Sequence, residues 1–86
     1  MKTATLNGVR YHVDVTGPID GATDVPRSTV PSIMLCRDLA TKAGLETCLH
    51  ESAHALYPLM SEEKVTQSAH DQARFLWGLG YRHVKD

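Results

Sequence analysis

Residues 45–57 read Leu-Glu-Thr-Cys-Leu-His-Glu-Ser-Ala-His-Ala-Leu-Tyr, and Pro58 follows them directly. Three leucines and a serine recur in this stretch at helical spacing and form one stripe. A proline cannot continue a helix, and it also disfavours helical backbone at the residue before it. The stretch therefore predicts a helix that starts at Leu45 and ends at or before Tyr57.

Two histidines of this predicted helix, His50 and His54, are four residues apart, and Glu51 follows the first of them. Residues four apart share one helix face, with Cβ atoms about 5–6 Å from each other. Two imidazoles at this spacing can bind one tetrahedral zinc ion at about 2.0–2.1 Å each. Glu51 is rotated by about 100° from His50, so we expect it to act as a general base on water rather than as a ligand.

A second helix is predicted shortly after the first. Ser61 is a favourable N-cap, and Glu62 and Glu63 suit the positive end of the helix dipole. Gly78 and Gly80 indicate where this helix ends. Its apolar stripe consists of Val65, Ala69, Ala73 and Leu76.

Three residues of the second helix are candidates for the third zinc ligand. Glu62 lies on the apolar stripe, so it is predicted to face the first helix and is the favoured candidate. Glu63 is rotated about 100° off that stripe and His70 about 80°, and both remain alternatives. Carboxylate and imidazole are both suitable ligands for zinc. We expect one zinc ion per chain.

The N-terminal part of the chain predicts strands. Asn7-Gly8, between two short apolar runs, is a strong signal for a β-hairpin. Residues 17–31 are rich in glycine and proline and predict an irregular loop, and residues 32–37 predict a third strand. The order indicates an α+β fold with a small antiparallel β-sheet, a hairpin plus a third strand, followed by two packed helices. We expect residues 1–86 to form a single domain.

Composition excludes several classes of function. The chain has 86 residues and a formal net charge of −1, whereas nucleic-acid-binding proteins usually carry a basic excess. A helix-turn-helix that binds DNA is also disfavoured, because Glu62 and Glu63 would repel phosphate. No apolar run approaches the roughly 18–20 residues that span a bilayer. We therefore expect no membrane partner, a cytoplasmic location, and reduced thiols at Cys36 and Cys48.

Other residues have both functional and ordinary interpretations. Asp71 could orient a zinc-bound imidazole, and Tyr57 could donate a hydrogen bond to an oxyanion. The ordinary interpretations are a solvated aspartate and a partly buried tyrosine that packs beside Pro58. Cys48 and Trp77 are predicted to pack in the core. His12 and His83 are expected to be exposed.

With these residues in view, the chain resembles a group of very short zincin-like proteins of phages and bacteria. The resemblance covers most of the chain, including Leu-His-Glu-Ser-Ala-His at 49–54, Ser-Glu-Glu-Lys-Val at 61–65 and Phe-Leu-Trp-Gly-Leu-Gly-Tyr-Arg at 75–82. It implies a stripped-down gluzincin whose third ligand is Glu62 or Glu63, and, for a phage-encoded chain, a location in the host cytoplasm. Compared with full-sized gluzincins, the interval between the motif and this glutamate is much shorter, and the large substrate-binding subdomains are absent.

Together these features predict zinc-dependent hydrolysis of peptide bonds in a peptide or protein substrate, with His50, His54 and Glu62 as zinc ligands and Glu51 as general base. The alternative is a zinc-stabilised protein-interaction module without catalysis, in which a fourth protein ligand closes the metal site. The third strand is expected to be exposed and could hold a peptide by strand addition.

Overall fold

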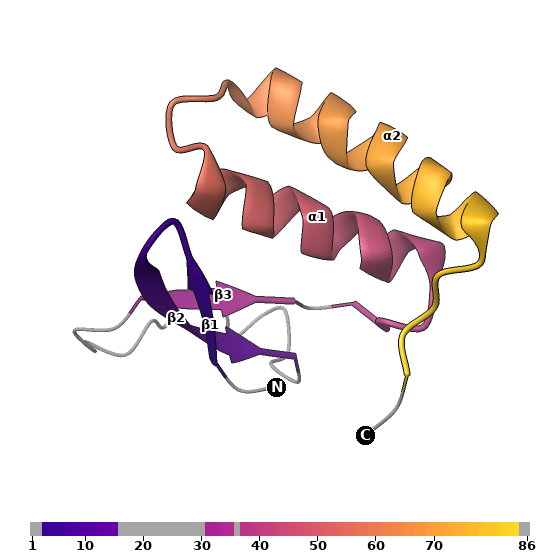
Figure 1. Cartoon of the computed structure of the whole chain (residues 1–86), viewed down its shortest axis with the longest axis horizontal. Coiled ribbons are helices and arrows are strands. Elements are labelled where there is room, and N and C mark those ends of the chain that lie inside the picture. Colours follow the sequence, from indigo (N-terminus) through magenta and orange to yellow (C-terminus); the bar gives the residue numbers. More distant parts are fainter. Residues whose placement is uncertain (1–2, 16–30, 36, 85–86) are drawn as a thin grey trace.

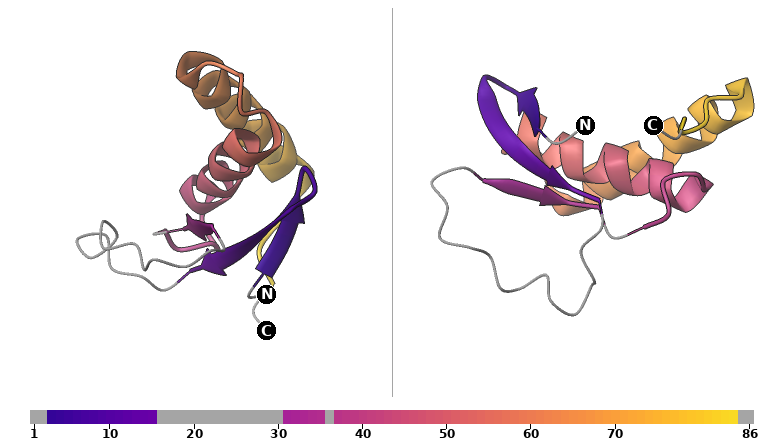
Figure 2. Two further views of the ribbon diagram at one scale, coloured as in Figure 1. Left: turned by 90° about the vertical axis from the view of Figure 1, so that its left-hand side faces the viewer. Right: turned by 90° about the horizontal axis from the view of Figure 1, so that it is seen from below.

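The described part of the chain forms a small sheet and two helices. The computed structural model describes residues 3–15, 31–35 and 37–84. The elements are β1 (Thr3–Leu6), β2 (Val9–Asp14), β3 (Ser32–Met34), α1 (Lys42–Leu56) and α2 (Glu62–Leu79). In Figure 1, and in the left view of Figure 2, α1 lies between the sheet and α2. The predicted α+β architecture is confirmed, while most of the predicted loop, residues 17–30, and Cys36 lie outside the described residues.

The hairpin of β1 and β2 forms as predicted. The two strands pair antiparallel, with Leu6 opposite Val9 at the turn. Asn7 and Gly8 have φ angles of 53° and 76°, which place both turn residues in the left-handed region. Asparagine and glycine adopt this region more readily than other residues, and two such residues in sequence suit a tight hairpin turn. This part of the sheet therefore follows from local sequence.

The third strand departs from the prediction in direction and length. β3 pairs parallel with β2, with Val13 opposite Ile33, so the sheet is mixed and its order is β1-β2-β3. The strand ends at Met34 rather than at Arg37. Parallel neighbours need a connection of a dozen or more residues, and residues 15–31 supply that length. The prediction of a purely antiparallel sheet is wrong, because the direction of β3 depends on this long connection.

The first helix begins at Lys42, earlier than the predicted start at Leu45. Its N-cap is Thr41, whose hydroxyl oxygen accepts a hydrogen bond from the Gly44 N–H at 3.0 Å. A side chain at position 44 would overlap the backbone carbonyl of Asp38, so glycine permits a close approach here. The segment that leads from β3 into α1 therefore lies directly on the first turn of the helix.

The ends of the two helices follow the predicted signals. α1 ends at Leu56, before Tyr57. Ser61 caps α2, and its hydroxyl oxygen accepts a hydrogen bond from the Lys64 N–H at 3.1 Å. α2 ends at Leu79, and its C-cap Gly80 has a left-handed φ of 100°. The other predicted breaker, Gly78, remains within the helix.

The core is small and consists mainly of the contact between the helices. The buried hydrophobic residues of the described chain are Leu35, Ala53, Val65, Ala69 and Ala73. Three of them, Val65, Ala69 and Ala73, belong to the predicted apolar stripe of α2, whereas its fourth member, Leu76, is partly exposed. This stripe packs against α1, and its small side chains let the two helices approach closely. In the described ranges, no helix combines the length and the apolar character needed to cross a bilayer. A cytoplasmic location stays a prediction.

Candidate metal centre

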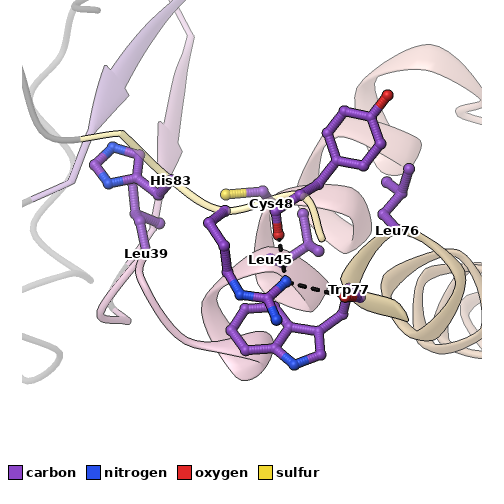
Figure 3. A pocket seen from close by; sticks show the side chains of 8 residues that line it. Leu39, Leu45, Cys48, Leu76, Trp77 and His83 are labelled. Atoms are coloured by element: carbon purple, nitrogen blue, oxygen red, sulfur yellow. Dashed lines mark hydrogen bonds between the residues drawn. The ribbon is translucent and has the colours of Figure 1, made fainter. Parts of the chain in front are cut away.

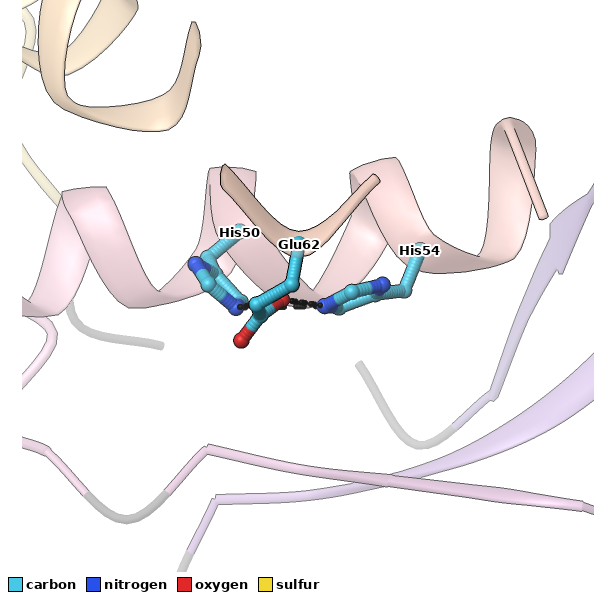
Figure 4. Close-up of side chains that lie close together, drawn as sticks. All are labelled: His50, His54 and Glu62. Atoms are coloured by element: carbon cyan, nitrogen blue, oxygen red, sulfur yellow. Dashed lines mark hydrogen bonds and ion pairs between the residues drawn. The ribbon is translucent and has the colours of Figure 1, made fainter. Parts of the chain in front are cut away.

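Three side chains from the two helices converge on one point beside the end of α1. His50 Nε2 and His54 Nε2 lie 3.2 Å apart. Glu62 Oε1 lies 2.7 Å from His54 Nε2 and 3.4 Å from His50 Nε2. Figure 4 shows the two imidazoles and the carboxylate pointing toward one another. His50, His54 and Glu62 thus form a group that could hold a metal ion.

The spacing of these atoms fits a zinc ion. Ligand atoms that surround a tetrahedral zinc at about 2.0–2.1 Å lie about 3.3 Å from one another. Two of the three observed separations, 3.2 Å and 3.4 Å, match this value, and the third is shorter at 2.7 Å. Two imidazole nitrogens and one carboxylate oxygen are also ligand types that zinc prefers. The donor set and its geometry therefore fit zinc with only a small change at Glu62.

The helices position each of these side chains. His50 and His54 are one helical turn apart on α1, and their rings lie edge to face with centroids 4.9 Å apart. Glu62 is the first residue of α2 and precedes Val65 on the stripe that faces α1. Because Val65 is fully buried between the helices, Glu62 one turn earlier emerges at the rim of the same contact. This placement agrees with the prediction that Glu62, on the apolar stripe of the second helix, faces the first helix and that Glu63 does not.

The cluster is open to solvent on one side. The side chain of His50 is 23% exposed, that of His54 42% and that of Glu62 68%. In the described ranges, no fourth metal-binding side chain joins the group. A metal held here would consequently keep access to water and to small molecules.

Glu51 lies beside the cluster without being part of it. It lines a polar hollow of about 230 Å³ together with His50. Glu51 therefore lies next to one of the candidate ligands. Its role itself stays a prediction.

The two alternative ligands, Glu63 and His70, are not members of this cluster. His70 Nδ1 is 3.3 Å from Glu46 Oε1, so the imidazole pairs with a carboxylate of α1 instead of joining the two motif histidines. Glu63 is exposed, and among the described residues it is not a member of the metal-ligating group. Both residues line a shallow region beside Glu62.

No hydrogen bond or ion pair of the described chain joins the remaining candidates to the cluster. Tyr57 is 54% exposed and is the C-cap of α1, where the chain leaves the helix. This exposure agrees with a partly buried side chain, and its packing beside Pro58 stays a prediction. Asp71 is exposed and lines a hollow with Arg74 and Phe75 on α2. No hydrogen bond joins Asp71 to a histidine in the described chain.

Cys48 lies near the middle of α1 and belongs to a separate, apolar part of the surface. It lines an apolar hollow of about 270 Å³ between the start of α1 and the end of α2 (Figure 3). Leu45 and Trp77 lie in the same wall, and the Arg82 guanidinium stacks 3.5 Å from the centroid of the Trp77 ring. Burial raises the pKa of the Cys48 thiol, so the side chain behaves as an apolar group. The predicted packing role of Cys48 is in accord with this position, and Trp77 is partly rather than fully buried.

Sequence reasoning missed two charged residues near the cluster. Glu46 lies one turn before His50 on α1 and reaches His70 across the helix contact. Arg37, in the segment between β3 and α1, lines the same hollow as Glu51. The spacing of Glu46 and His50 was a readable signal, since residues four apart share a face. Arg37 had no such signal, because its position depends on how the segment lies on α1.

No protein-family model matches this chain, and no curated protein or solved structure matches it either. The resemblance to short zincin-like proteins therefore rests on the motif residues alone and stays a prediction.

Proposed function

We propose that this protein is a minimal zincin-like metallopeptidase that binds one zinc ion through His50, His54 and Glu62. The observation that carries the proposal is the convergence of two imidazole nitrogens and one carboxylate oxygen at the separations of zinc ligands. A surface cluster held only by hydrogen bonds is the ordinary alternative. In that alternative an imidazole N–H donates to the other ring or to the Glu62 carboxylate, whereas zinc also accounts for three ligand-type atoms that stand near the separations of zinc ligands.

The chemistry follows from the residues around the proposed ion. A zinc ion bound here would act as a Lewis acid and lower the pKa of a coordinated water to about 7. Glu51 accepts a proton as the water oxygen attacks the peptide carbonyl carbon. When the C–N bond breaks, Glu51 returns that proton to the leaving amine. The position of Glu51 in the hollow beside His50 supports this division of roles.

The sheet offers a way to hold an extended substrate. β3 lies at an edge of the described sheet, since its neighbour in the strand order is β2 alone. An edge strand can pair through its backbone with an added peptide strand. A peptide or protein substrate bound in this way would need no large binding subdomain.

The small core gives zinc a second role. Only Val65 among the larger side chains is fully buried in the described chain. Domains of this size often depend on a metal or a partner for stability. We therefore expect zinc binding and folding to be coupled.

The decisive experiment compares the wild type with Glu51→Gln on a broad peptide library, with zinc-loaded and chelated samples of each. We expect Glu51→Gln to retain zinc and fold while hydrolysis is lost, because glutamine keeps the size of the side chain but cannot accept the proton. Loss of zinc in this variant would mean that Glu51 is itself a ligand.

A second candidate is a zinc-stabilised interaction module without catalysis. Phe75 and Leu79, one turn apart on α2, are 67% and 62% exposed, and exposed apolar residues favour contact with another protein. This candidate replaces the peptidase if zinc-loaded wild type cleaves no member of the library and a fourth protein ligand closes the metal site.

A further inference from the structure

A polar hollow beside the proposed reaction centre carries an inference about the substrate, which rests on the proposed peptidase function. Its wall contains His50, a proposed ligand, and Glu51, the proposed base. The other lining residues are Arg37, Ala43, Glu46 and Thr47. A group bound in this hollow would therefore lie next to the bond that is cleaved.

Arg37 is the one cationic side chain in this wall, and it is available to a ligand. It belongs to the segment between β3 and α1 and is exposed. Within the described residues, its guanidinium forms no ion pair and no hydrogen bond. A guanidinium is a fork of donors that suits a carboxylate, which it can bind through two parallel hydrogen bonds.

The backbone next to Arg37 is fixed against α1. The carbonyl oxygen of Asp38 accepts hydrogen bonds from the Thr41 hydroxyl at 2.7 Å and from the Thr41 N–H at 3.1 Å. The Asp38 carboxylate accepts a hydrogen bond from the Ala40 N–H at 2.9 Å. The same segment lies against Gly44, where no side chain intervenes. The guanidinium therefore projects from a held position rather than from a free loop.

The carboxylates in the wall do not neutralise Arg37. Glu46 is within 3.3 Å of His70, on the side of α2. Glu51 lines the hollow but forms no ion pair with Arg37 in the described chain. The hollow thus contains a free cation beside a base.

We propose that Arg37 binds a carboxylate of the peptide substrate and so directs cleavage to a bond next to that carboxylate. The volume of the hollow, about 230 Å³, is below the roughly 300–1,000 Å³ of sites that enclose drug-sized ligands. It suits a single residue at a chain end better than a longer segment. The carboxylate can come from a free C-terminus or from an acidic side chain, and both present the same chemistry to the guanidinium.

A binding experiment tests the contact without requiring turnover. N-acetylglycine and its amide are titrated into the purified protein with zinc added, and NMR signals are followed. We expect only the acid to bind, with an affinity that falls about 10- to 100-fold in Arg37→Gln and less in Arg37→Lys. Arg74→Gln, at an exposed arginine on α2, is the matched control and should bind as the wild type does. Equal binding by wild type and Arg37→Gln, as expected if the metal alone takes the acid, overturns the proposal.

A cleavage experiment separates the sources of the carboxylate and the two proposals. Peptides with a free C-terminus, the same peptides amidated, and amidated peptides that end in Asp are compared. We expect Arg37→Gln to lower kcat/KM about 10- to 100-fold for whichever carboxylate is used, and to leave the neutral amides unchanged. If kcat/KM depends neither on the carboxylate of the peptide nor on Arg37, this inference is rejected but the proposed peptidase function is not. No zinc and no cleavage rejects the peptidase, and the titration still decides whether Arg37 binds a carboxylate.

Discussion

The two ends of the helix pair differ in chemistry: one carries a polar cluster and the other an apolar hollow. At one end, His50, His54 and Glu62 bring three possible metal-ligating atoms together at the surface. At the other end, an apolar hollow is formed around Leu45 and Trp77. The buried stripe of α2 joins the ends and holds the helices together. The apolar end is held by contacts of its own side chains, whereas the polar end would gain most from the zinc ion that we propose.

The largest effect should come from His54→Ala. A ligand that binds only the folded state stabilises it by about 4 kcal/mol when present at 1,000 times its Kd. We expect zinc to raise the Tm of the wild type because it binds the folded state. The rise should be absent in His54→Ala, which lacks one of the two proposed histidine ligands. Thermal unfolding with and without zinc measures it, and His83→Ala, at an exposed histidine outside the cluster, is the control. A zinc-dependent Tm that survives in His54→Ala contradicts the metal centre.

Trp77→Ala tests the apolar end. We expect a loss of about 2 kcal/mol in the free energy of unfolding, less than for a fully buried tryptophan, since Trp77 is partly buried and also loses the stacked Arg82. The loss should be the same with and without zinc. Phe75→Ala, at an exposed aromatic residue of the same helix, is the matched control and should have a smaller effect. If Trp77→Ala also lowers zinc affinity, the two ends are coupled and the comparison fails.

Glu62→Gln and Glu63→Gln sharpen the comparison at the polar end. We expect Glu62→Gln to weaken zinc binding at least about ten-fold, because the loss of a charged ligand should cost no less than the loss of a group that only orients one. The effect should be smaller than that of His54→Ala, because the amide oxygen remains a weak ligand. Glu63→Gln should leave the affinity unchanged, as a competition titration can show. The reverse order would assign the role to Glu63, and two negligible effects would favour His70.

The smallest effect concerns the thiol at the apolar end. Burial raises the pKa of Cys48, so a smaller fraction is thiolate at a given pH in the folded than in the unfolded protein. We expect alkylation of Cys48 near pH 8 to be several-fold slower in the folded state, measured by mass spectrometry in a Cys36→Ser variant. The same shift means that stability decreases as pH rises above the ordinary thiol pKa. Equal rates with and without denaturant would show that the hollow does not bury the thiol.

Local signals predicted much of the fold and the cluster. Ser61, Gly80 and Asn7-Gly8 act through their own backbone geometry, so each helix end or turn was readable from a few residues. The placement of Glu62 toward the first helix followed from helical periodicity, which depends on no distant contact. These features need only the residues within one or two turns.

The features that were missed depend on distant contacts. The parallel direction of β3 depends on a long connection, and the pair of Glu46 and His70 joins residues 24 positions apart. The early start of α1 was missed because Gly44 is a poor helix former, whereas its lack of a side chain is what lets the segment before the helix lie close. The position of Arg37 depends on the same close approach between Asp38 and Gly44, so local sequence did not predict it.

The short separation of the three candidate ligands along the chain has a consequence for the order of folding. His50, His54 and Glu62 lie within one helical hairpin, so the loop that a bound ion would close is short. Closing a short loop loses little chain entropy, and contacts between near neighbours form quickly. An ion could therefore assemble the helical hairpin before β3 pairs with β2, because the connection between these two strands is much longer than the turn between β1 and β2. Zinc would then act on the rate of folding as well as on its equilibrium.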